Sequence, residues 1–212
     1  MGQEVASTCM LDHVLVEAIA ALRRGLESSL LERHAAEERF QLDVLLGDIS
    51  WETSYTLPFE GVPPRVQADI AFDWSTWSQT AFRSWKVGDA GDDPPEIEIE
   101  VVLRIQRLAL QPDAVAVLAA LPDEGPAILG EPLEREGPMV QQHLDPSAGT
   151  AQFAVEVSYV GVARLPVEVL EEPGRLDAHL GPLGTWVATS LVRLADLELE
   201  FVPPEMEEGG MR

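Results

Sequence analysis

The strongest constraint on the fold is a strong two-residue alternation of apolar and mainly polar side chains in three separate segments. From Val66 to Trp74 the even positions are apolar, and from Glu96 to Ile105 the odd positions are apolar. Residues 153–159 show the same period. Successive side chains of a β-strand point to opposite faces of a sheet, so this pattern predicts strands with one buried face. We therefore expect a mainly β protein.

The N-terminal part of the chain has a helical period instead. Ser7 and Thr8 are suitable N-cap residues, and the segment after them carries leucines at intervals of three or four residues. These are Leu11, Leu15, Leu22, Leu26 and Leu30. We expect a long helix over residues 9–38 that packs on the sheet, with pairing to a second copy of the chain as the alternative.

The other segments are less regular. Residues 40–44 alternate and predict a strand, residues 113–120 predict a short strand, and residues 185–202 predict a final strand. Gly, Pro and acidic residues dominate 122–149, which predicts a loop with one or two short strands. The apolar phase of the strand from Glu96 moves from odd to even positions after Ile105, and a strand needs a bulge for such a change.

A weak internal similarity points to a duplication. Residues 68–75 resemble residues 151–158, and residues 103–110 resemble residues 192–199. We therefore predict a mainly β (α+β) fold in which the long helix packs on two related antiparallel β units, arranged like a sandwich. The expected division is a mobile lead 1–8, a helix 9–38, a first β unit 39–121, a second β unit 122–202 and a disordered acidic tail 203–212.

The charge balance limits the partners. The chain has 14 Lys+Arg and 37 Asp+Glu, a formal net charge of −23. A surface of this charge repels nucleic acid and anionic lipid, so we expect neither as a partner. A basic protein partner remains open. With Cys9 as the only cysteine and no recognisable secretory leader or membrane-spanning run, we expect a cytoplasmic location.

No catalytic or metal-binding motif is recognisable. The histidines His13, His34, His143 and His179 stand apart, and no cysteine–histidine cluster of the zinc type exists. We therefore expect a protein that is not an enzyme, with no catalytic, metal or cofactor-binding residues and no cofactor.

Two groups of residues are candidates for protein contacts. Trp77, Phe82 and Trp85 follow the strand that ends at Trp74, and tryptophan provides a large contact area at low entropic cost. Core packing of these aromatic residues is the alternative. Glu96, Glu98 and Glu100 occupy alternate positions and should project from one strand face. That face is either simply solvated or a site for a basic protein.

Two segments carry a resemblance to a known family. The segment from Leu15 to Leu26 reads Leu-Val-Glu-Ala-Ile-Ala-Ala-Leu-Arg-Arg-Gly-Leu, and Phe40-Gln41-Leu42-Asp43 follows it. They are similar to the opening helix and the first strand of the bacterial trypsin-co-occurring domain family, which residues 10–110 resemble. The resemblance implies a bacterial helix-plus-sheet module associated with trypsin-like proteases and an adaptor role. It implies no site residues, and the second half of the chain has no counterpart in the family.

These observations favour a non-catalytic adaptor or assembly component of a bacterial system, acting through a protein partner or through self-association into a homo-oligomer. A small-ligand binder or enzyme with a pocket between the β units is one alternative. An acidic inhibitor that mimics nucleic acid is another.

Overall fold

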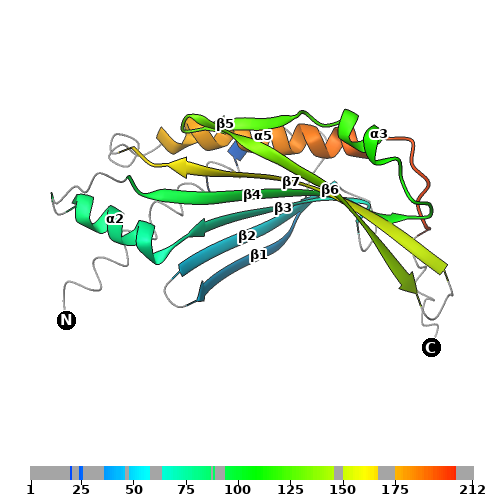
Figure 1. Ribbon diagram of the computed structural model, residues 1–212, viewed down its shortest axis with the longest axis horizontal. Helices are drawn as coiled ribbons and strands as arrows, with labels where there is room; N and C mark the ends of the chain where they lie inside the picture. The colour runs from blue at the N-terminus through cyan, green and yellow to red at the C-terminus, as the bar shows by residue number, and fades with distance from the viewer. Residues whose placement is uncertain are drawn as a thin grey trace.

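A computed structural model of the chain describes residues 20, 24–25, 36–45, 48–57, 64–86, 88, 94–145, 150–166 and 175–203. In this part of the chain, seven strands form one antiparallel sheet with the order β1-β2-β3-β4-β7-β6-β5 (Figure 1). The strands are β1 (Ala36–Leu45), β2 (Asp48–Thr56), β3 (Val66–Trp74), β4 (Glu96–Leu108), β5 (Glu124–Ile128), β6 (Glu131–Asp145) and β7 (Thr150–Arg164). The helices are α2 (Thr76–Lys86), α3 (Ala114–Ala119) and α5 (Arg175–Ala195).

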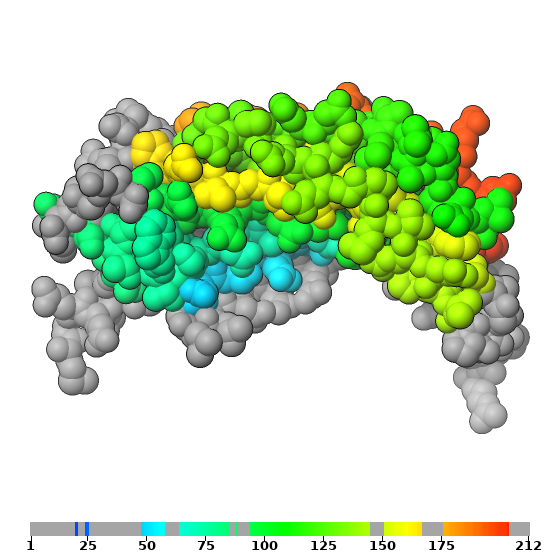
Figure 2. All heavy atoms as spheres, in the orientation of Figure 1, coloured from blue at the N-terminus to red at the C-terminus, as the bar shows by residue number. Residues whose placement is uncertain are grey.

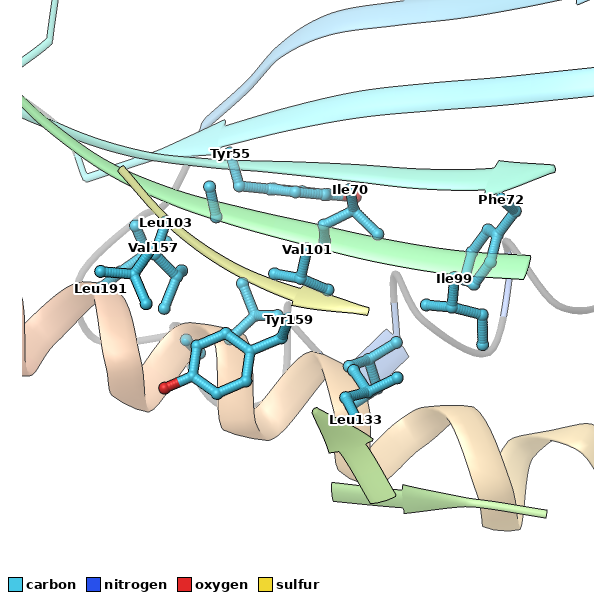
Figure 3. Packing of buried hydrophobic residues seen from close by; sticks show 14 of the residues in the cluster. Tyr55, Ile70, Phe72, Ile99, Val101, Leu103, Leu133, Val157, Tyr159 and Leu191 are labelled. Atoms are coloured by element: carbon cyan, nitrogen blue, oxygen red, sulfur yellow. The ribbon is translucent and has the colours of Figure 1, made fainter. Parts of the chain in front are cut away.

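The core lies between the sheet and α5. Ile70, Val101 and Tyr159 are register partners on β3, β4 and β7, and all three are buried. Figure 3 shows these side chains on the same side of the sheet as Leu191 of α5. We call this side the inner face and the opposite side the outer face. The alternation in the sequence therefore placed the apolar side chains of β3, β4 and β7 correctly.

The predicted sandwich of two β units is wrong. The strands of both expected units belong to one sheet, because β7 pairs with β4 along most of its length. A helix, and not a second sheet, covers the inner face, where α5 contacts β3, β4 and β5. The fold is therefore a curled antiparallel sheet with a helical layer.

The predicted final strand over residues 185–202 is also wrong, since α5 extends to Ala195. Its large buried apolar side chains are spaced by three or four residues, as one helix face requires: Leu176, Leu180, Leu183, Val187, Leu191 and Leu194. The expectation failed because Val192, Leu194, Leu197, Leu199 and Phe201 also alternate in part, and a short apolar run fits either period.

Residues 122–149, where a loop with one or two short strands was expected, contain the short strand β5 and the 15-residue strand β6. Leu129 and Gly130 both have positive φ, at 55° and 111°, between β5 and β6. Two such residues are characteristic of a tight hairpin turn whose twist matches that of the strands. A register shift between Glu136 and Met139 accommodates Gly137, which has φ 94°. Glycines and prolines thus mark turns and bulges of a sheet in this segment.

Two further elements differ from the expectation. Residues 114–119 form helix α3, because the Asp113 side chain accepts a hydrogen bond from the Val115 N–H and caps the helix. The aromatic segment after Trp74 forms α2, which was not predicted, and β2 was not predicted either. The bulge expected after Ile105 is confirmed by a register shift between Ile105 and Leu108, with Arg107 at φ 62°.

The predicted N-terminal helix lies largely outside the described residues. Ala20, Arg24 and Gly25 are helical, whereas residues 36–38, which were assigned to the same helix, belong to β1. The lead 1–8 and residues 204–212 of the tail are also outside the described part. The similarity at offset 89 pairs β4 with α5, a strand with a helix, so it does not reflect a structural repeat.

Candidate protein-interaction face

The outer face of the sheet carries mainly polar side chains. Figure 2 shows this side of the molecule, with α5 visible only along its upper edge. Six carboxylates on this face are exposed: Glu52, Asp73, Glu98, Glu100, Glu134 and Glu136. They come from four strands, so the sheet gathers acidic side chains that are up to 84 residues apart in the sequence.

Pairing across the sheet arranges some of these carboxylates in a row. Glu52, Ala71, Glu100, Val160 and Glu134 are successive register partners on β2, β3, β4, β7 and β6. Neighbouring strands are about 4.8 Å apart, so consecutive carboxylates of the row are separated by about 10 Å with one small apolar residue between them. We call this set the acidic row.

Like charges also meet directly across strand pairs. Asp73 lies opposite Glu98, and Glu124 lies opposite Glu134. Directly opposed like charges destabilise a sheet, so this face keeps pairs that oppose folding. A bound cationic group would relieve that repulsion.

Next to the acidic row, Arg104 of β4 joins two carboxylates. Its Nη1 lies 3.1 Å from an oxygen of Asp69, and its Nε donates to Glu156 Oε1 at 2.6 Å. Ser54 and Gln67 both donate to Asp69 at 2.5 Å, and Gln141 donates to Glu156 at 3.0 Å. These contacts run from β2 to β6 and hold the charged groups in fixed positions, which suits recognition of a partner.

Two shallow depressions flank Glu100. One has a volume of about 420 Å³ and is lined by Glu52, Ser54, Asp69 and Arg104 among others. The other has a volume of about 440 Å³ and is lined by Asp73, Glu98, Glu131 and Glu134 among others. Small-molecule sites are usually enclosed and mostly apolar, whereas these hollows are open and each is lined by at least three carboxylates, which favours a macromolecular partner.

The three predicted glutamates of β4 do project from one face, as the alternation requires. Glu98 and Glu100 are exposed, while Glu96 is half-buried and accepts a hydrogen bond from Arg164 Nε at 3.0 Å. Arg164 Nη1 also contacts Glu131 at 3.1 Å, and these two carboxylates raise the pKa of the guanidinium above its ordinary value. Glu96 is thus engaged within the protein, and Glu98 and Glu100 remain available for contacts.

The predicted aromatic group is only partly at the surface. Phe82 is 3% exposed and meets buried Trp74 edge-on, with ring centroids 5.8 Å apart, so Phe82 is a core residue. Trp77 is 55% exposed on α2. Trp85 belongs to α2, but its side chain lies outside the described part of the structure.

Helix α2 is fixed to the sheet at its first turn. The Asp48 carboxylate accepts hydrogen bonds from the backbone N–H and the hydroxyl of Thr76, which lower its pKa below the ordinary value. The Ser78 hydroxyl donates to the Glu96 carbonyl at 2.6 Å and accepts from the Glu96 N–H. Trp77, between these anchored residues, is therefore held on a rigid element.

The described space between the sheet and α5 offers no room for a ligand. The apolar space between the sheet and α5, lined by Phe72, Ile99, Ile128 and Leu176 among others, holds about 10 Å³, which is no more than one water. The alternative of a pocket between two β units finds no support there. Within the same residues, no cluster of metal-ligating side chains occurs, and no helix has the length and apolar character to cross a bilayer.

Comparison of the chain with protein-family models, curated proteins and solved structures gave no match. The resemblance to the trypsin-co-occurring domain family therefore stays a prediction. Sequence reasoning found Glu98 and Glu100 but missed the acidic row and the Arg104 contacts. The sequence showed charged residues at outward positions of β3 and β4, which include Asp69 and Arg104. Which of these residues meet each other, and which join the acidic row, follows only from the pairing register of the strands.

Proposed function

We propose that this protein is a non-catalytic binding protein whose acidic outer face engages a basic segment of a partner protein. The observation that carries the proposal is the acidic row, Glu52–Ala71–Glu100–Val160–Glu134. The net charge of −23 and the opposed pair of Asp73 and Glu98 support a cationic ligand. A cytoplasmic location belongs to the same proposal and is supported by the presence of a single cysteine, Cys9.

The spacing of the acidic row favours a helical partner segment. Residues i and i+7 of an α-helix lie on the same side, about 10 Å apart, with residues i+3 and i+4 between them. A helix lying across the strands can therefore place basic residues over Glu52, Glu100 and Glu134. Apolar residues between them then meet Ala71 and Val160. An extended segment matches poorly, because its side chains on one face are about 7 Å apart.

The same row argues against mimicry of nucleic acid. A phosphate backbone presents charge without interruption, whereas Ala71 and Val160 place apolar surface between the carboxylates of this row. A partner adapted to nucleic acid would gain nothing from those two residues. An amphipathic basic helix gains both ion pairs and apolar contact.

A designed peptide tests the proposal. The probe is a fluorescein-labelled amphipathic helix with lysines at i, i+7 and i+14 and leucines at i+3, i+4, i+10 and i+11. A peptide of the same composition with shuffled lysines serves as the control ligand. We expect anisotropy to show binding of the first peptide, weakened at high salt because the contacts are charged.

Variants identify the surface. Glu52→Gln, Glu100→Gln and Glu134→Gln should each weaken binding about twofold to fivefold, as expected for exposed ion pairs, and the triple variant more. Glu198→Gln, at an exposed position outside the sheet, should have no effect beyond the change in net charge. Equal binding of both peptides, or unchanged binding by the triple variant, would contradict the proposal.

A further inference from the structure

Strand β6 has one edge that is only partly paired. Along one side it pairs with β7 from Glu134 to Asp145. On the other side, β5 pairs with Glu131, Pro132 and Glu134 only. Within the described part of the chain, no strand pairs with the remaining edge from Met139 onward. This stretch belongs to the β6–β7 hairpin, which projects at the lower right of Figure 1.

This edge lacks the usual protection against pairing. Residues 139–144 contain no proline and no Asp, Glu, Lys or Arg, in a chain in which charged residues make up 24%. Met139 is 55% exposed and Leu144 is 74% exposed. Natural edge strands are normally blunted by charge, by proline or by short length, because their free backbone groups pair readily with another strand.

The other two edges of the sheet are protected in these ways. The sequence of β1 includes Glu37, Glu38, Arg39 and Asp43. Strand β5 has five residues and contains Gly125-Pro126. The end of β6 is therefore the edge at which an added strand meets the least opposition.

We propose that residues 140–144 of β6 pair antiparallel with the same residues of a second copy of this chain. A two-fold axis perpendicular to the sheet relates two such edges, and it keeps the inner faces of both copies on the same side. The sheet would then continue from one copy into the other through the two β6 strands.

The side chains select one register. With Gln142 opposite itself, Val140 lies opposite Leu144 of the other copy, which joins two apolar side chains on the inner face. Centring the pair on Gln141 would place Leu144 opposite Pro138, which lacks a backbone donor. The residues paired in the register centred on Gln142 do not include Glu131, Pro132 and Glu134, which pair with β5, so the two pairings use different parts of this edge.

The composition of the edge is compatible with a second copy as the occupant. Two chains of −23 repel, and residues 140–144 bring no carboxylate into the contact, so self-association is least opposed there. A basic partner would instead be attracted to the acidic row. The proposed pairing is thus independent of the proposed function, since it uses a different surface with a different chemistry.

Light scattering after size-exclusion chromatography tests the pairing with the full chain in 0.3 M NaCl. We expect the mass to rise from one chain toward two chains as the concentration increases. Gln142→Lys and Gln142→Glu each place like charges at the two-fold axis and should abolish the rise. An equimolar mixture of the two variants should restore it, because the opposite charges then face each other.

Two controls keep the test decisive. Thr80→Lys, an exposed change of the same charge on α2, should leave the dimer intact, and circular dichroism should show that all variants are folded. In a Cys9→Ser background, Gln142→Cys should form a disulfide between chains under mild oxidation, because opposed residues lie within disulfide range. A chain that stays monomeric at every concentration overturns the proposal, as does a dimer that is unaffected by Gln142→Lys.

Discussion

Arg107 and Val202 bind each other through both side chain and backbone. Arg107 Nη2 donates to the Val202 carbonyl at 2.8 Å, and the Val202 N–H donates to the Arg107 carbonyl at 2.7 Å. Arg107 sits at the β4 bulge with φ 62° and is 6% exposed. The bulge therefore turns the Arg107 side chain towards the segment after α5, and these hydrogen bonds hold that segment at the end of β4. Leu108 and Phe201 form an antiparallel β-bridge at the same place.

This arrangement predicts an unusual order of stability for substitutions at Arg107. Arg107→Ala removes the hydrogen bonds of the guanidinium and keeps the strained φ, so we expect a loss of about 1–3 kcal/mol. Arg107→Gly loses the same bonds but relieves strain of about 1 kcal/mol, and should be the more stable of the two. At Arg104, within the regular part of β4, Gly should be the less stable. Urea unfolding of the four variants measures both orders.

A second prediction concerns the contact between the helical residue Gly25 and α5. A Cβ added at Gly25 would lie 2.3 Å from the Gly181 carbonyl oxygen, whereas a Cβ at Gly181 would meet nothing within 4 Å. Beside them, Arg24 forms an ion pair with Asp177.

Gly25→Ala should lower the melting temperature because the two backbones must separate. Gly181→Ala should raise stability by about 0.5–1 kcal/mol, since alanine favours a helix interior. Equal effects of the two changes would show that this close approach is absent in solution.

The accuracy of the sequence prediction followed the burial of each strand. Strands β3, β4 and β7 lie in the middle of the sheet with one face fully buried, so their alternation was plain and their inward residues were assigned correctly. The β4 bulge was also predicted, because the apolar positions of this strand change from odd to even numbers, and such a change is visible in a single sequence. Strand β2 interleaves Ser and Thr with Trp51 and Tyr55, which hid its period.

The layer opposite the sheet was not predictable in the same way. Leu183, Val187, Leu191 and Leu194 have a helical spacing in the sequence, but the overlapping alternation of Val192, Leu194, Leu197 and Leu199 fits a strand, and the sequence does not decide between the two. The acidic row and the Arg104 contacts depend on strand register, which joins Glu52, Glu100 and Glu134 across five strands. No local pattern in a single sequence specifies which residues meet across strands.

The carboxylate of Asp48 predicts a pH dependence of stability. Its pKa is lowered by the hydrogen bonds from Thr76, so its contribution is present above the ordinary value of 3.8 and is lost as the pH falls through the lowered pKa. Asp48→Asn should therefore be less stable than the parent protein at pH 7, and the difference should shrink below pH 3.8. Urea unfolding between pH 2.5 and about pH 7 measures it. A difference that stays constant over this range would mean that the negative charge contributes nothing.

Arg104 should matter more to stability than Arg164, although each lies between two carboxylates. The side chain of Arg104 is 30% exposed, and its partner Glu156 is 13% exposed, so Arg104→Met leaves the carboxylates of Asp69 and Glu156 without their counter-charge at a partly buried position. We expect a loss of about 1–2 kcal/mol in urea unfolding after allowance for solvent screening. Arg164 is 57% exposed, and Arg164→Met should have a smaller effect. The opposite order would show that the Arg104 contacts are not maintained in solution.

The opposed carboxylates of Asp73 and Glu98 predict that binding and stability change in opposite directions. Both are exposed, and they face each other across β3 and β4. Asp73→Asn removes the repulsion and should raise the free energy of unfolding by about 0.2–1 kcal/mol. The same change should weaken binding of the lysine-spaced helical peptide, because one carboxylate of the outer face is lost. Asp196→Asn, exposed just after α5, provides the matched control and should leave the affinity for the peptide unchanged. If Asp73→Asn stabilises the fold and leaves peptide affinity intact, the repulsion is real but the outer face near Asp73 does not take part in binding.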